Sequence, residues 1–241
     1  FIPMLENRYY AISLFSNEWW INTLLTIIII SLLLFVSKIF LRKNKIKSFN
    51  TFVGSILLFR CVWVQWYQYS MGFWDIQWSL PLQMCSLSAI MSGLLPIFEN
   101  TGISKKYKQL IFEFLFYFSV GAFYSILTPV YTTGTEGLIY YEYYISHGGI
   151  LFSAIYFYMI LGYKPRIYSW LKIFLYTQPI LLLIHIINYT IGGQANYFYT
   201  MEPPIADNPL VMGQYPMHII LLNLFALIHF GLLYFFTKKT K

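Results

Sequence analysis

The sequence predicts an all-α, polytopic membrane protein: seven transmembrane helices forming a single bundle domain over residues 1–241, with the N-terminus outside and the C-terminus cytoplasmic. Three observations predict this class. Only 10% of the residues are charged, against about 25% in a typical soluble domain, so too few charges remain to cover a soluble surface. Seven apolar segments each approach the length of about 20 residues that a membrane helix needs. Most basic residues fall on alternate connections between these segments, which is the positive-inside pattern.

The seven segments follow one another with short connections, so no room remains for a soluble domain. The first segment, 19–41, has an almost uninterrupted apolar centre. The second, 48–71, is the least apolar because it holds Arg60, Gln65 and Gln68. The other predicted helices cover residues 79–98, 109–130, 140–162, 168–191 and 215–237.

The positions of lysine and arginine give the orientation. Fourteen of the 16 basic residues surround the first, third and fifth connections and the C-terminal end. These positions alternate along the chain, so we expect them on the cytoplasmic side of the cell membrane. The long connection at 192–214, rich in proline and glycine, then lies outside, where we expect it to cover the mouth of the bundle.

The net charge of +7 does not indicate a nucleic-acid partner, because the basic residues stand in short clusters beside apolar segments. Membrane lipids are the expected partners, and the sequence leaves the oligomeric state open. The histidines are isolated, with no His-x-x-x-His or Cys-x-x-Cys pair. We therefore expect no metal site and no cofactor, which leaves Cys–His chemistry, a binding pocket, or a non-catalytic role.

Polar side chains inside the predicted spans are the first candidates for a site, because ionisable groups in a bilayer are costly. Cys85, His147 and His185 each lie six or seven residues inside the outer end of a predicted helix. At about 1.5 Å per residue, all three would lie roughly 9–11 Å below the outer boundary. Arg60 lies deeper in the second helix. These depths predict a polar site in the outer half of the bundle.

Helical spacing adds two neighbours to these candidates. Tyr144 stands three residues before His147, and Asn188 three residues after His185, so each pair shares a helix face. Each candidate also has a structural interpretation. A buried cysteine can be a small apolar side chain, and an intramembrane histidine can bond the backbone of another helix. Arg60 can pair with a carboxylate for packing alone.

Four short sequences in order resemble the YwaF-like family of bacterial integral membrane proteins. They are Leu-Pro-Leu-Gln-Met-Cys at 80–85, Leu-Thr-Pro at 127–129, Ser-His-Gly at 146–148, and Asn-Tyr-Phe-Tyr at 196–199 with Glu-Pro-Pro at 202–204. The chain is also distantly similar to a eukaryotic seven-helix family of membrane phospholipid acyltransferases that use a cysteine and a histidine. Gln83 and Ser86 depart from the YwaF-like pattern, which often has histidine and aspartate there.

The resemblance implies Cys85 as nucleophile and His147 as base, with Gln83, Asn196 and Tyr197 near the substrate. An imidazole can take the thiol proton, and the thiolate can then attack an acyl ester. Arg60 could hold a phosphate or an oxyanion. The predicted function is thus a lipid acyltransferase or transacylase acting on phospholipid.

The alternative is a small-molecule binding or transport protein with a polar pocket in the outer half of the bundle. A further alternative is a structural subunit of a larger membrane complex.

Overall fold

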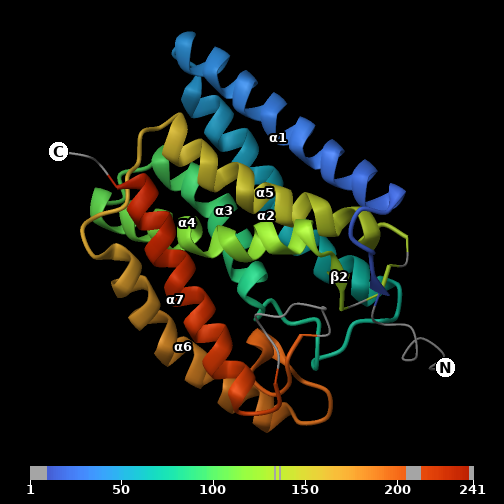
Figure 1. The fold of residues 1–241 in the computed structure, drawn as a ribbon. Helices are drawn as coiled ribbons and strands as arrows, with labels where there is room; N and C mark the ends of the chain where they lie inside the picture. Colours follow the sequence, from blue (N-terminus) through green and yellow to red (C-terminus); the bar gives the residue numbers. More distant parts are fainter. Residues whose placement is uncertain (1–9, 133, 136, 205–212, 239–241) are drawn as a thin grey trace.

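The computed structural model describes residues 10–132, 134–135, 137–204 and 213–238, and this part of the chain is almost wholly helical (Figure 1). Each predicted segment corresponds to one helix, so the all-α prediction is confirmed. The seven helices in these ranges are α1 (Asn17–Arg42), α2 (Ile46–Ser70), α3 (Met84–Glu99), α4 (Lys105–Leu127), α5 (Ile139–Met159), α6 (Ser169–Ile191) and α7 (Met217–Thr237).

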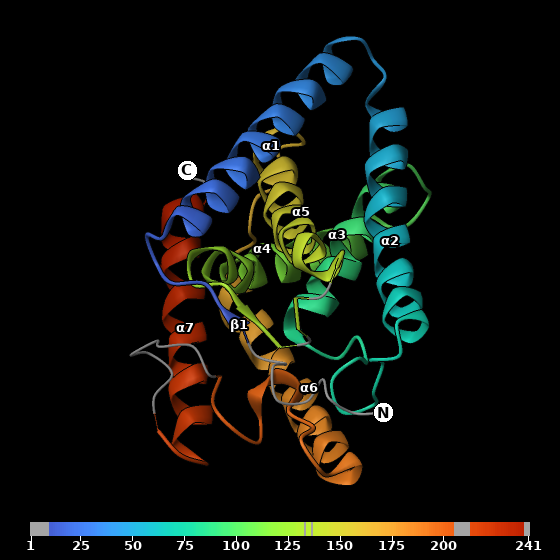
Figure 2. The same ribbon diagram turned by 90° about the vertical axis from the view of Figure 1, so that its right-hand side faces the viewer.

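The helices form three groups. Helices α3, α4 and α5 lie in the middle, the α1–α2 hairpin flanks them on one side, and α6 and α7 flank them on the other (Figures 1 and 2). Helix α3 packs against α2, α4 and α5, while α6 packs against α7 and α4. The large core of buried side chains lies among α2 to α5 and includes Leu95, Phe112, Ile150 and Phe157, each with 0% exposure.

Helices α2 and α3 meet at a pair of glycines. A Cβ atom added to Gly54 would lie 2.7 Å from the carbonyl oxygen of Gly93 and 2.7 Å from Cγ1 of Ile97. Real Cβ atoms do not approach a backbone oxygen so closely, so the missing side chain allows the two helices to pack at this distance.

The third helix begins later than the sequence predicts, at Met84 instead of residue 79. Pro81 disfavours helical backbone angles at Leu80, the residue before it, and the segment 79–83 before α3 is irregular. Helix α3 therefore has 16 residues and is about 24 Å long, which is shorter than the hydrocarbon core of about 30 Å. As a consequence Cys85 is the second residue of the helix and not a residue six positions inside it.

The fourth helix ends at Leu127, before Pro129, and not at residue 130. Instead, Val130–Tyr131 forms a short strand, β2, that pairs antiparallel with β1, Tyr10–Ala11. This two-stranded sheet could not be predicted from the sequence, because two residues are too few to show the alternation typical of a strand. The sheet ties the segment before α1 to the connection between α4 and α5.

Much of the outer surface is apolar. Helix α1 exposes large side chains along its length, including Leu24, Ile28 and Phe35. Among the described residues, α1, α4, α6 and α7 are long and apolar enough to cross a membrane. An extended apolar surface needs a lipid or protein partner. Because this surface lies on long apolar helices, the partner is most simply the lipid of a membrane.

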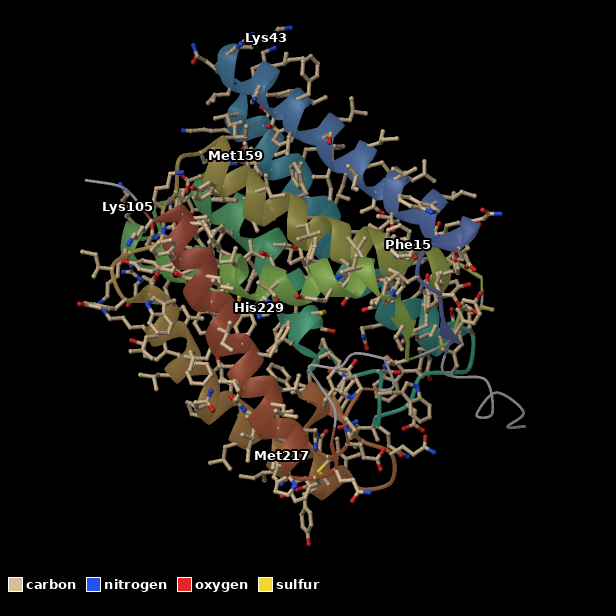
Figure 3. The ribbon with its side chains drawn as sticks, in the orientation of Figure 1. Phe15, Lys43, Lys105, Met159, Met217 and His229 are labelled. Carbon is tan, nitrogen blue, oxygen red and sulfur yellow. The ribbon has the colours of Figure 1, made fainter. Side chains whose placement is uncertain are left out.

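The ends of the helices alternate between two sides of the bundle. Lys43, Lys105 and Met159, near three of the basic connections, lie toward the upper left of Figure 3, whereas Phe15 and Met217 lie toward the opposite side. The long connection predicted to cover the bundle is described from 192 to 204 and from 213 onward; residues 205–212 lie outside the described part. It contains a short 3-10 helix, η1 (Tyr197–Tyr199).

Candidate functional site

A cavity of about 390 Å³ lies between the central helices and the α6–α7 pair. Side chains from α2 to α7, the residues before α3, and the connection after α6 line it. Four of the predicted site residues are among them: Arg60, Gln83, Cys85 and His147. The structure thus brings the predicted nucleophile, base and arginine to one cavity.

Cys85 reaches the cavity from the first turn of α3. Its Sγ atom lies 4.0 Å from the Oγ atom of Ser125 on α4. The N-terminus of a helix carries a partial positive charge, and Cys85 is the second residue from this end of α3. The late start of α3 places Cys85 there, and this start could not be predicted from the apolar segment alone.

His147 is held in a defined orientation by its own helix. Its Nδ1 atom lies 2.7 Å from the carbonyl oxygen of Tyr143, and its ring centroid lies 4.3 Å from that of Tyr143. A carbonyl oxygen can only accept, so Nδ1 donates and Nε2 carries the lone pair. Nε2 makes no hydrogen bond with any described residue, so it is available to a group in the cavity.

Cys85 and His147 are connected through two neighbours instead of a direct hydrogen bond. Ser125, beside the Cys85 sulfur, accepts a hydrogen bond at its carbonyl oxygen from the Tyr143 hydroxyl, at 2.8 Å. The Tyr143 ring in turn lies against the ring of His147. Ser125 was not among the sequence candidates, and α4 carries other polar side chains, such as Ser119, from which the sequence does not distinguish it.

Arg60 of α2 forms an ion pair with Glu142 of α5 beside the same cavity. The two side chains are 11% and 14% exposed. Arg60 also contacts the Cys61 sulfur through Nη2, at 3.0 Å. Glu142 was not selected from the sequence, although a carboxylate inside a span is a strong signal of a buried partner.

Gln83 lines the cavity, but its side-chain amide forms hydrogen bonds with the connection after α6. Its Oε1 atom accepts a hydrogen bond from the backbone N–H of Phe198 at 2.9 Å. Its Nε2 atom donates to the carbonyl oxygen of Asn196 at 3.3 Å. These bonds place Phe198 and the residues after it on the cavity wall.

Asn188, Asn196 and Tyr197, all predicted to bind substrate, lie outside the cavity lining and hold the connection in place. Asn188 donates to the Tyr197 carbonyl and the Thr200 hydroxyl, each at 2.8 Å, and accepts from the Tyr197 N–H at 3.0 Å. Asn196 bonds backbone groups at 201 and 202.

The Tyr197 hydroxyl lies between two backbone groups before α3. It donates to the carbonyl oxygen of Ile76 at 2.7 Å and accepts from the N–H of Leu80 at 2.9 Å. The side chain is fully buried, and this burial raises the pKa of Tyr197 to about 12.

Tyr144 and His185 also lie outside the cavity lining. The Tyr144 ring packs beside Tyr140 and Tyr143 near β2. The His185 ring lies parallel to that of Tyr215, with centroids 6.1 Å apart. The depth of a residue along a helix does not determine which face of the helix its side chain occupies. The predicted depth of His185 therefore could not show that this residue lies outside the cavity lining.

The cavity has a second, mostly apolar region between α4, α6 and α7. The aromatic rings of Phe118, Phe174, Phe225 and Phe230 line it. Polar side chains also meet here: Gln178 of α6 donates to Asn223 of α7 at 3.0 Å. The cavity therefore offers polar groups at one end and an apolar wall at the other, as an amphipathic ligand requires.

Comparisons with known proteins identify the family. The searches of curated proteins and of solved structures find no match to the chain. The sequence profile described as the TMEM164 family matches residues 14–234, which includes all seven helices except the last three residues of α7. The YwaF-like resemblance is not confirmed by this match and stays a prediction. The chain therefore belongs to the TMEM164 family of multi-pass membrane proteins.

Proposed function

We propose that this protein is a lipid acyltransferase in which Cys85 is the nucleophile and His147 the general base. The observation that carries the proposal is that side chains from two separate helices, a thiol and an imidazole with a free Nε2, line one cavity. The resemblance to a seven-helix acyltransferase family with a cysteine and a histidine supports the same pair.

The reaction would proceed in two halves. Nε2 of His147 takes the thiol proton, and the sulfur of Cys85 attacks the carbonyl carbon of a phospholipid ester. The C–O bond breaks, leaving an acyl thioester on Cys85, and the departing lysolipid oxygen takes the proton from His147. A hydroxyl or amine of a second lipid then attacks the thioester and gives its proton to His147. The C–S bond breaks, and His147 passes the proton to the departing sulfur, which restores the Cys85 thiol.

Formation of the reactive pair needs a movement, since Cys85 and His147 are not hydrogen-bonded to each other. The S···O contact of 4.0 Å between Cys85 and Ser125 is weak, so it does not prevent rotation of the Cys85 side chain. Active-site contacts often tighten only when substrate is bound.

The rest of the cavity suits a phospholipid. The aromatic wall between α4, α6 and α7 can receive an acyl chain, while Arg60 can donate to a phosphate or to a developing oxyanion. Its pairing with Glu142 keeps the guanidinium oriented in the cavity before substrate binds.

We also propose that all seven helices cross the cell membrane, with the N-terminus outside. The support is the gathering of Lys43, Lys105 and the end of α5 on one side of the bundle (Figure 3). A membrane-impermeant thiol reagent applied to intact cells tests this orientation. It should label Gln194→Cys and not Lys43→Cys; the opposite pattern would reverse the orientation.

The activity is tested with purified protein in lipid nanodiscs that contain an acyl-labelled phospholipid and an unlabelled lysophospholipid. Cys85→Ala should reduce acyl transfer to background. Cys61→Ala is the matched control: Cys61 also borders the cavity, but its thiol bonds the Leu57 carbonyl of its own helix at 3.3 Å. Undiminished transfer by Cys85→Ala excludes the covalent scheme.

A small-molecule binding or transport protein is the second candidate. It is favoured by the absence of a direct Cys85–His147 hydrogen bond and by the polar Gln178–Asn223 pair in the apolar region. A lipid or small ligand that is retained equally by the wild type and Cys85→Ala, with no transfer by either, would support it.

A further inference from the structure

We propose that the basic side of the bundle holds a second site, which binds the phosphate headgroup of an anionic phospholipid. A hollow of about 230 Å³ lies there between the N-terminal ends of α4 and α6. It shares no residue with the larger cavity, so it does not depend on the proposed acyl transfer. Its lining residues are Lys106, Tyr107, Leu110, Glu113, Arg166, Ser169, Lys172, Ile173 and Tyr176.

The inner wall of the hollow is a tightly bonded ion pair. Glu113 is 1% exposed and accepts from Arg166 through Nε at 2.9 Å, Nη2 at 2.7 Å and the backbone N–H at 2.9 Å. Gln109 adds a fourth bond at 3.1 Å. The carboxylate is thus fully engaged, while the Arg166 side chain remains 47% exposed with Nη1 unused by any described residue.

Two further cations in the hollow have no anionic partner. Lys106 and Lys172 form neither an ion pair nor a hydrogen bond through their ammonium groups within the described residues. Two other lysines on this side are engaged: Lys108 lies 3.7 Å from Glu99, and Lys164 lies over the Tyr158 ring at 3.3 Å. Glu113 is the one acid among the lining residues, so the hollow has an excess of positive charge.

This excess selects an anion with several oxygen acceptors. Two ammonium groups and a fixed guanidinium around one hollow match a phosphate group, which accepts from several donors at once. The N-terminus of α6 adds to the positive potential, since its first turn has no side-chain cap.

The surroundings of the cations favour a lipid over free phosphate. Tyr107 and Tyr176 are 60% and 51% exposed at the rim, and Leu110 and Ile173 line the same hollow. Amphipathic rings prefer the level of the headgroups. Both helices that frame the hollow are apolar enough to cross a membrane, and basic pockets between such helices are typical sites for anionic headgroups.

The test compares lipid binding by the whole purified protein in detergent. The probes are a fluorescent phosphatidylglycerol, the matching zwitterionic phosphatidylcholine, and inorganic phosphate as competitor. The double variant Lys106→Gln/Lys172→Gln removes the unpaired cations. The double variant Lys43→Gln/Lys45→Gln is the control, because it removes the same charge at the distant turn between α1 and α2.

We expect the first double variant to bind phosphatidylglycerol roughly 30-fold more weakly, the equivalent of about 1 kcal/mol for each lysine. The control should stay within about twofold of the wild type, and phosphatidylcholine should bind weakly to all three proteins. Equal binding by both double variants would overturn the proposal. Competition by phosphate that is as strong as binding of the lipid, without a preference for phosphatidylglycerol, would also overturn it, because the ligand would then be a free anion.

Discussion

Asn188 should control the local stability of the connection after α6, which lines part of the cavity. This side chain is 1% exposed and makes three hydrogen bonds, two with the backbone of Tyr197 and one with the Thr200 hydroxyl, at 2.8–3.0 Å. Asn188→Ala removes all three and leaves buried groups unpaired. At about 1 kcal/mol for each bond, the free energy for local opening should fall by about 3 kcal/mol.

Hydrogen exchange measures this change directly. A loss of about 3 kcal/mol corresponds to roughly 150-fold faster exchange of the Tyr197 amide. Thr190→Ala is the control, because its hydroxyl bonds only the Ile186 carbonyl of the same helix and is exposed. Thr190→Ala should accelerate exchange less than about fivefold. If Asn188→Ala also accelerates it by less than about fivefold, the three hydrogen bonds of Asn188 do not hold the connection in place.

Three further predictions concern the bundle. Glu142→Gln should destabilise the protein by about 3–5 kcal/mol, because it leaves Arg60 without its partner in a buried pair; a double-mutant cycle with Arg60→Gln that shows no coupling would contradict this. Gly54→Ala should cost about 1–3 kcal/mol and lower the thermal midpoint, because its Cβ would meet a backbone carbonyl at 2.7 Å, whereas Gly102→Ala, with no atom within 4 Å, should be neutral; equal midpoints would refute the close approach. The pKa of Tyr197 is raised to about 12, so its protonated phenol stabilises the fold below the ordinary pKa of about 10, and this stability is lost as the pH rises through about 12. Tyr197→Phe lacks this titrating group, so its thermal midpoint should fall less between about pH 9 and pH 12 than that of the wild type. An equal fall in both proteins would contradict the assignment.

The helices themselves could be predicted from the sequence, because long apolar segments leave few alternatives. Their ends could not be predicted equally well. The apolar segment from 79 to 98 continues across Pro81, yet the helix starts only at Met84. The strand Val130–Tyr131 looks like the end of an apolar helix until its partner, far earlier in the chain, is known.

The candidate site was predictable in part. The cost of polar groups in a bilayer singled out Cys85, His147 and Arg60, and all three line the cavity. Depth along a helix does not show which face of the helix a side chain occupies. His185 was therefore predicted at the site although it lies outside the cavity lining. Residues that hold a loop, such as Asn188, cannot be distinguished from ligand-binding residues without knowing what lies opposite them.

The central claim is that Cys85 carries the acyl group between two lipids. The most direct measurement is peptide mass spectrometry of the protein after brief exposure to an acyl-labelled phospholipid without an acceptor. The claim predicts a labelled acyl thioester on Cys85, none on Cys61, and a much slower appearance of the adduct in His147→Ala. Acyl transfer that proceeds with Cys85 unmodified, or that persists in Cys85→Ala, would contradict it.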